Sequence, residues 1–173
     1  VFAIFLELLF LLQMFRVFPP NGFLASIVSD VLVDYTNENR VRLGESRYVG
    51  VLKRNPVLDE AARRKAEDMA QKNYFAHTGP DGLTPWHWFY EVGYNFLYAG
   101  ENLAVDFFDS DATFEAWMAS PLHRANILNS HFTEIGIGVA RGIRNGRETM
   151  YIVQLFGTPQ REQGVAVSTK ELP

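Results

Sequence analysis

The sequence predicts an α+β domain in which helices cover a small antiparallel sheet. Two observations carry this prediction: apolar residues recur at helical spacing through most of the chain, and an alternating strand pattern follows toward its end. Ile135, Ile137 and Val139 alternate with small residues, and residues 150–156 return as a partner strand. Asn145-Gly146 between them is a typical two-residue hairpin turn. With 173 residues, 47% of them hydrophobic, the chain can bury the core of one domain.

Two longer helices are expected first. In the first, apolar residues at helical spacing begin near Ile27 and continue to Leu43, and Gly44 is expected to end the helix. The second begins near Pro56 and ends at Asn73. The inward face of this second helix repeats at helical spacing, with Leu58, Ala61, Ala62, Lys65, Ala66, Met69 and Ala70. Its other face is charged, which is typical of a solvated surface.

Two shorter helices follow. Thr84 and Pro85 mark the start of one, and Gly93 marks its end. An aspartate or serine at 109–111 starts the next, which Pro121 stops. The first of these helices is crowded with aromatic residues, which we interpret as core: Trp86, Trp88, Phe89 and Tyr90.

The ends of the chain differ from its centre. Residues 1–18 are almost wholly apolar and would span about 27 Å as a helix, close to the hydrocarbon thickness of a bilayer. We therefore expect a transmembrane or uncleaved signal helix that contacts the membrane, although Glu7 counts against an anchor and favours an apolar helix packed on the domain. A linker at 19–29, a domain at 30–160 and a tail at 161–173 complete the expected organisation.

Charge and composition exclude several classes of function and of site. The net charge of -4 provides no basic face for nucleic acid, and the absence of cysteine excludes disulfides and thiolate zinc sites. Gly136 and Gly138 resemble a dinucleotide loop only faintly, because no helix follows them, so no nucleotide is expected. Ser120 near His123 lacks a nucleophile-elbow sequence and is weak evidence for a hydrolase.

Four short motifs carry the strongest functional signal. They are Asn73-Tyr-Phe-Ala-His77, Gly100-Glu-Asn-Leu103, Ser120-Pro-Leu-His-Arg-Ala-Asn-Ile-Leu128 and Tyr151-Ile-Val-Gln-Leu-Phe-Gly157. In order and spacing they resemble the CAP superfamily of cysteine-rich secretory, antigen 5 and pathogenesis-related 1 proteins, in its bacterial SCP-like extracellular branch. The resemblance covers about residues 31–159 and implies a CAP-type α-β-α sandwich with a further strand near residues 95–99.

The resemblance also implies a site. CAP proteins carry two histidines and two glutamates in a central cavity, a tetrad that can hold a divalent metal, usually zinc. By motif, His77 and His123 correspond to the histidines and Glu101 to the first glutamate. At the position of the second glutamate this chain has Ser120, and Glu115 and Glu134 are the alternative substitutes. The other two histidines, His87 and His131, are interpreted as structural.

Three ligands and a water would suffice for a catalytic zinc, so His77, His123 and Glu101 are candidate metal ligands. The alternative is a hydrogen-bonded network that holds three loops together. Three amides, Asn102, Asn126 and Gln154, are expected to support the same cleft because an amide among apolar neighbours needs partners.

Three functions are compatible with these residues. The first is a membrane-tethered, extracytoplasmic or secreted domain, non-enzymatic or weakly enzymatic, that binds a lipid, glycan or peptide at the bacterial envelope, with or without a divalent metal. The second is a metal-dependent hydrolase of peptides or wall components, which would require an open metal position and a base. The third is a structural module in which residues 1–18 matter most.

Overall fold

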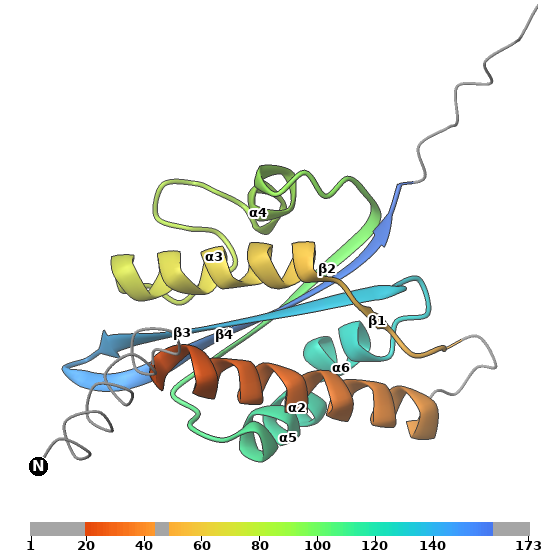
Figure 1. The fold of residues 1–173 in the computed structure, drawn as a ribbon, viewed down its shortest axis with the longest axis horizontal. Helices are drawn as coiled ribbons and strands as arrows, with labels where there is room; N and C mark the ends of the chain where they lie inside the picture. Colours follow the sequence, from red (N-terminus) through yellow and green to blue (C-terminus); the bar gives the residue numbers. More distant parts are fainter. Residues whose placement is uncertain (1–19, 44–48, 161–173) are drawn as a thin grey trace, which may run out of the picture.

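The computed structural model describes residues 20–43 and 49–160, and in it a four-stranded sheet lies between two layers of helices (Figure 1). One face of the sheet is covered by α3 (Pro56–Lys72) and α4 (Pro85–Glu91). The opposite face is covered by α2 (Pro20–Leu43), α5 (Ser110–Ala119) and α6 (Pro121–Ile127). This arrangement confirms the predicted α+β sandwich. The apolar helix expected at 1–18 and the tail at 161–173 lie outside the described residues.

The strands of the sheet are β1 (Lys53–Arg54), β2 (Phe96–Val105), β3 (Glu134–Arg144) and β4 (Arg147–Pro159). They are ordered β1-β3-β4-β2. The pairs β3–β4 and β2–β4 are antiparallel, as predicted, whereas β1 runs parallel to β3. The sequence did not predict β1, because two residues are too few for a strand pattern to be recognised. The further strand expected at 95–99 is longer than predicted and extends through the motif at Gly100.

The hairpin between β3 and β4 turns as the sequence predicts. Asn145 and Gly146 have φ angles of 52° and 75°, which is the conformation of a type I′ turn. The flanking residues Arg144 and Arg147 are paired, so the turn fixes the register of the whole hairpin.

Helix α3 packs very closely on β3. Its ends match the prediction, because the Asn55 side chain accepts a hydrogen bond from the Val57 N–H and Asn73 closes the helix with a φ of 51°. A Cβ atom at Gly136 or Gly138 would overlap the α3 backbone, so these glycines permit the close approach. This close contact therefore fixes the distance between α3 and the sheet.

The segment at 19–29, expected as a linker, is helical from Pro20 onward. The helix begins at a proline, and proline is favoured in the first turn of a helix. Only the end of this segment is buried: Ser29 is 4% exposed, and Val28 packs on the core below the sheet. Within the described residues, no helix is both long enough and apolar enough to cross a membrane.

Two hydrophobic clusters hold the layers together. The cluster beneath the sheet includes Trp117, Phe132 and Ile152, and the cluster above it includes Leu58, Phe89 and Tyr151. In the aromatic helix α4, Trp88 and Phe89 are buried, as expected of core residues. Trp86 and Tyr90 differ from the expectation, being 39% and 60% exposed, because they lie on the outer face of this short helix.

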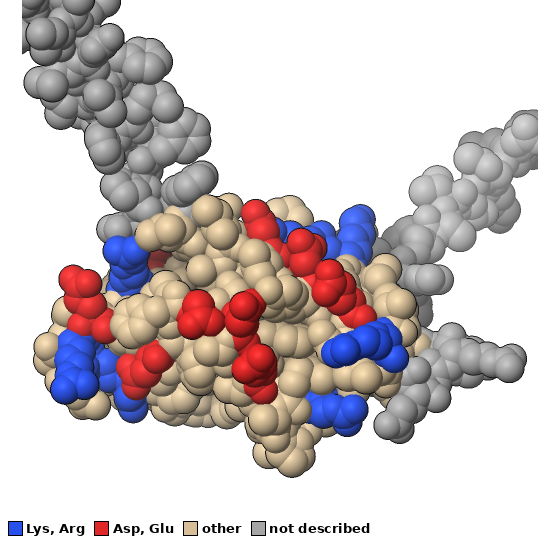
Figure 2. Space-filling model, turned by 90° about the horizontal axis from the view of Figure 1, so that it is seen from below, with Lys and Arg blue, Asp and Glu red and all other residues tan. Residues whose placement is uncertain are grey.

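Charge on the lower face of the molecule is mixed. Acidic side chains cross the middle of the face formed by α2 and α5, and basic side chains lie toward both of its ends (Figure 2). This face therefore has no continuous basic surface.

Candidate functional site

Glu101 lies at the centre of the candidate site. It stands in the middle of β2, opposite Leu155 of β4, and its side chain is only 2% exposed. One carboxylate oxygen, Oε1, is 2.6 Å from Nδ1 of His77, whose side chain is 59% exposed. A buried carboxylate thus holds a surface imidazole in one orientation and leaves its Nε2 as the free nitrogen.

Burial and pairing act in opposite directions on this pair. Burial raises the pKa of Glu101, while the hydrogen bond from His77 and the nearby Lys65 ammonium lower it. The same hydrogen bond raises the pKa of His77, and burial of the ring opposes that rise. The second oxygen of Glu101, Oε2, is buried and has no hydrogen-bond partner among the described residues. The carboxylate therefore retains an unused acceptor beside the imidazole.

Lys65 is the residue of this region whose role the sequence analysis missed. It belongs to α3, is fully buried, and donates to the carbonyl of His77 at 3.0 Å and to the Tyr74 hydroxyl at 3.1 Å. Burial lowers its pKa, and the charge of Glu101 counteracts this effect. The signal was a lysine within the otherwise apolar face of the helix. Lys65 fixes the backbone of the loop that carries His77.

The three predicted amides form one connected network. Asn102 Nδ2 donates to Gln154 Oε1 at 2.9 Å and to the His123 carbonyl at 3.2 Å. Asn126 Nδ2 donates to Asn102 Oδ1 at 2.9 Å and to the Glu101 carbonyl at 3.0 Å. Gln154 Nε2 donates to the Thr36 hydroxyl at 2.9 Å. The network joins β2 and β4 to α6 and α2.

His123 lies on α6, on the side where the network fastens this helix to β2. Its pKa is lowered, first by burial and then by the charge of His77. Protonation of His77 therefore disfavours protonation of His123. The structure brings His77 into contact with Glu101 and leaves His123 as a separate neighbour.

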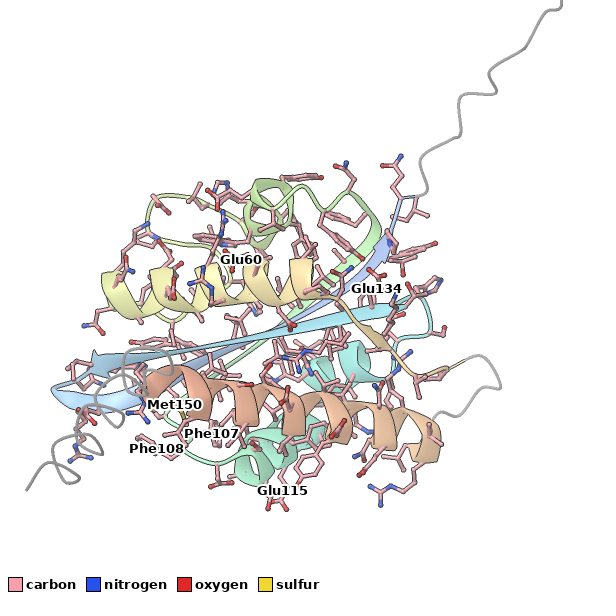
Figure 3. All side chains as sticks on the ribbon, in the orientation of Figure 1. Glu60, Phe107, Phe108, Glu115, Glu134 and Met150 are labelled. Carbon is pink, nitrogen blue, oxygen red and sulfur yellow. The ribbon has the colours of Figure 1, made fainter. Side chains whose placement is uncertain are left out.

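Neither proposed substitute supplies a second glutamate to this group. Glu134 at the start of β3 accepts from Asn55 at 2.7 Å and from the Tyr94 hydroxyl at 2.8 Å. Glu115 lies on the outer side of α5, far from Glu134 (Figure 3). Ser120 occupies the junction between α5 and α6 and caps neither helix with its side chain.

The donor set does not fit a metal as it lies. Among residues 20–43 and 49–160, no three His, Cys, Asp or Glu side chains are grouped so that they would hold a metal ion. Nδ1 of His77 is bonded to Glu101, so Nε2 is the ring nitrogen of this residue that remains for a ligand. We therefore derive no chemical step through a metal.

Comparisons with known proteins agree with the fold and the motifs. The chain is 37% identical over 107 residues to the protein YkwD of Bacillus subtilis, an alignment that covers 62% of this chain and 40% of YkwD. It is 34% identical over 110 residues to the membrane protein YlbC of the same organism, covering 64% and 31% of the two chains. The chain thus matches less than half of the length of each relative.

Solved structures of bacterial proteins are also similar to this chain. An extracellular SCP-domain protein of Bacillus anthracis superposes with a TM-score of 0.67 at 28% identity, over 77% of this chain and 41% of that one. An outer surface protein of Borrelia burgdorferi has the same fold, with a TM-score of 0.61 at 23% identity over 76% and 92% of the two chains. The model of the CAP family, described as the cysteine-rich secretory protein family, matches residues 33–156. The chain therefore belongs to the CAP family.

Proposed function

We propose that this domain is a binding module of the bacterial cell envelope and that the His77–Glu101 pair is the polar centre of its ligand site. One observation carries the proposal: a buried carboxylate fixes an exposed imidazole at 2.6 Å. Structural histidines seldom require a charged partner that is itself costly to bury. A site that must present one imidazole nitrogen to a ligand does require it.

The geometry defines the contacts that a ligand would make. With Nδ1 bonded to Glu101, neutral His77 offers Nε2 as a hydrogen-bond acceptor, and protonated His77 offers it as a donor. His123 supplies a second, half-buried imidazole with a lowered pKa, which favours its neutral form. Hydroxyl and amide groups complement such a pair, so lipid headgroups, wall glycans and peptides are the ligand classes that we expect.

Binding is favoured over hydrolysis by what surrounds His77. A glutamate–histidine pair also orients the general base of many hydrolases. Among the described residues, however, His77 makes side-chain hydrogen bonds only to Glu101, and no serine or threonine hydroxyl contacts it. A side-chain nucleophile within hydrogen-bond reach of the base is required for covalent hydrolysis, so this form of hydrolysis is disfavoured.

An extracytoplasmic location is part of the proposal. It is supported by the similarity to an extracellular SCP-domain protein and to a protein named as a membrane protein. The apolar residues 1–18 would then tether the domain to the membrane.

The proposal is tested with the full chain and two defined probes. Soluble peptidoglycan fragments and vesicles containing a neutral glycolipid are titrated against the wild type and against His77→Ala and His87→Ala. His87 is a matched control because it is a partly exposed histidine paired only with Glu91 of its own helix. We expect one probe to bind, with affinity reduced about tenfold in His77→Ala, the value of one lost charge-assisted hydrogen bond. Equal binding by both variants would refute the role of His77.

A further inference from the structure

The outer edge of β3 is largely unpaired. β1 pairs with β3 only at Lys53↔Glu134 and Arg54↔Ile135, so no strand lies beside the rest of β3 on that side within the described residues. Figure 1 shows this edge running between α3 and α2. The remainder of β3 therefore presents backbone groups that another strand could pair with.

The direction of each backbone group follows from the hydrogen bonds. The carbonyl of Ile135 accepts from the Asn55 N–H, so residue 135 faces outward toward β1. Ile137 also faces outward, because its N–H donates to Asp59 Oδ1 at 2.8 Å and its carbonyl accepts from Ser29 at 3.1 Å. Since the pattern of a strand repeats every two residues, the backbone groups of residues 139, 141 and 143 face outward as well.

The register of the hairpin agrees with this assignment. Residues that flank a two-residue hairpin loop form a hydrogen-bonded pair, and here they are Arg144 and Arg147. Even-numbered residues of β3 therefore bond to β4, and odd-numbered residues do not. A partner could bond to Val139 and Arg141 without disturbing the sheet.

Side chains of neighbouring elements form hydrogen bonds with the outward backbone groups of β3 only as far as Ile137 in the described part of the chain. No hydrogen bond to the outward N–H or carbonyl of Val139 or Arg141 comes from residues 20–43 or 49–160. These groups lie in the floor of a cavity of about 570 Å³ that is lined by β3, by α3 and by the first turns of α2. The cavity does not include His77, Glu101 or His123, so it is separate from the candidate ligand site.

We propose that this groove binds an extended peptide segment of a partner protein, which pairs with β3 from Val139 to Ile143 as an added strand. Only an extended polypeptide offers N–H and carbonyl groups at the spacing of a strand edge, whereas a lipid chain offers none. A second copy of this chain is disfavoured, because its own β3 edge is recessed between the same two helices. The outward groups span five residues of β3, which is about 17 Å of strand.

The charges of the groove indicate one feature of the peptide. Each acidic residue of the lining has an ion-pair partner: Asp59 pairs with Arg54, and both Glu60 and Glu67 pair with Arg63. Arg141 is exposed and makes no ion pair with the described residues. The lining as a whole is balanced, with three arginines and three acidic residues, but Arg141 is the arginine that has no ion-pair partner in the described part of the chain, so we infer that the peptide places an acidic side chain beside it.

The test uses a blocked seven-residue peptide of alternating threonine and valine with one central aspartate. It is titrated against the full chain while amide exchange is followed by NMR. Binding should slow the exchange of the Val139 and Arg141 amides. The variant Arg141→Pro removes an outward N–H that β4 does not use, and it should weaken binding about tenfold more than Arg141→Ala, which keeps that N–H. A peptide N-methylated on its pairing face supplies the same test without changing the protein.

Three outcomes would overturn the proposal. The first is no binding of the peptide at millimolar concentration. The second is equal binding by Arg141→Pro and Arg141→Ala, or by the peptide and its N-methylated form, which would show that the backbone edge is not used. The third is strong protection of the Val139 and Arg141 amides in the free full chain, which would mean that the protein covers this edge itself. None of these results bears on the His77 site.

Discussion

Replacing Asn102 by alanine should destabilise the domain more than any single surface change, because this amide is the centre of the network that fastens α6 to the sheet. The side chain is fully buried and takes part in three hydrogen bonds, with Gln154, Asn126 and the carbonyl of His123. At about 1 kcal/mol each, their loss amounts to roughly 3 kcal/mol. For a domain of this size, that corresponds to a decrease in Tm of about 6–12 °C.

The assay is urea unfolding followed by tryptophan fluorescence, with Asn39→Ala as the matched control. Asn39 is a partly buried asparagine of α2 that donates to the carbonyl of Tyr35 and accepts from the exposed Arg42, both within its own helix. Its replacement should cost less than about 1 kcal/mol. Equal losses in the two variants would refute the view that the Asn102 network contributes to stability as a unit.

A double-mutant cycle with Asn126→Ala measures the shared bond. Asn126 loses two hydrogen bonds when it is replaced, to Asn102 and to the Glu101 carbonyl, so about 2 kcal/mol is expected. Because one bond is common to both variants, the double variant should lose about 1 kcal/mol less than the sum of the single losses. Strict additivity would mean that the two amides act separately.

Three further predictions concern the site and the packing of α3. In NMR titrations the pKa of His77 should lie above 6.5 and the pKa of His123 should lie below it. Because folding raises the pKa of His77, the stability that this residue contributes should be complete below pH 6.5. That contribution should disappear as the pH rises through the folded-state pKa. Gly138→Ala should destabilise the domain by about 1–3 kcal/mol, since the new Cβ overlaps the α3 backbone, whereas Gly50→Ala, with open space around it, should be nearly neutral in the same urea assay. Zinc should not bind tightly in calorimetry, and a one-to-one complex lost in both His77→Ala and His123→Ala would contradict this expectation.

Local signals predicted much of the fold. The bounds of α3 follow from Pro56 and Asn73, and the hairpin follows from Asn145-Gly146, because caps and turns depend on neighbouring residues. Periodicity could not predict β1, whose two residues become a strand only through pairing with β3. The start of α2 at Pro20 was also missed, because the apolar pattern that predicted this helix begins only near Ile27.

In the candidate site, too, the residues could be predicted from the sequence, but their contacts could not. The motifs selected His77, Glu101 and His123, and the structure adds that His77 and Glu101 form a hydrogen-bonded pair, 2.6 Å apart. Lys65 could be placed on the inner face of its helix from spacing alone. Its partners, the His77 carbonyl and Tyr74, come from a loop beyond that helix, and no local pattern specifies where such a loop returns.

The positive charge of Lys65 offsets the negative charge of the one buried glutamate in the site, so the charges balance without a second glutamate and a metal ion. Four metal ligands that include two carboxylates would need a cation between them to offset their charge. In this chain Ser120 stands at the second carboxylate position, and one buried carboxylate remains. Burial raises the pKa of Glu101, and the hydrogen bond from His77 and the buried ammonium of Lys65 oppose that rise, as a metal cation would. Adding a divalent ion would leave the pocket with excess positive charge beside a buried lysine, whereas a neutral ligand that donates a hydrogen bond to His77 or Glu101 would not. The charge balance of the site therefore favours a polar, uncharged ligand group.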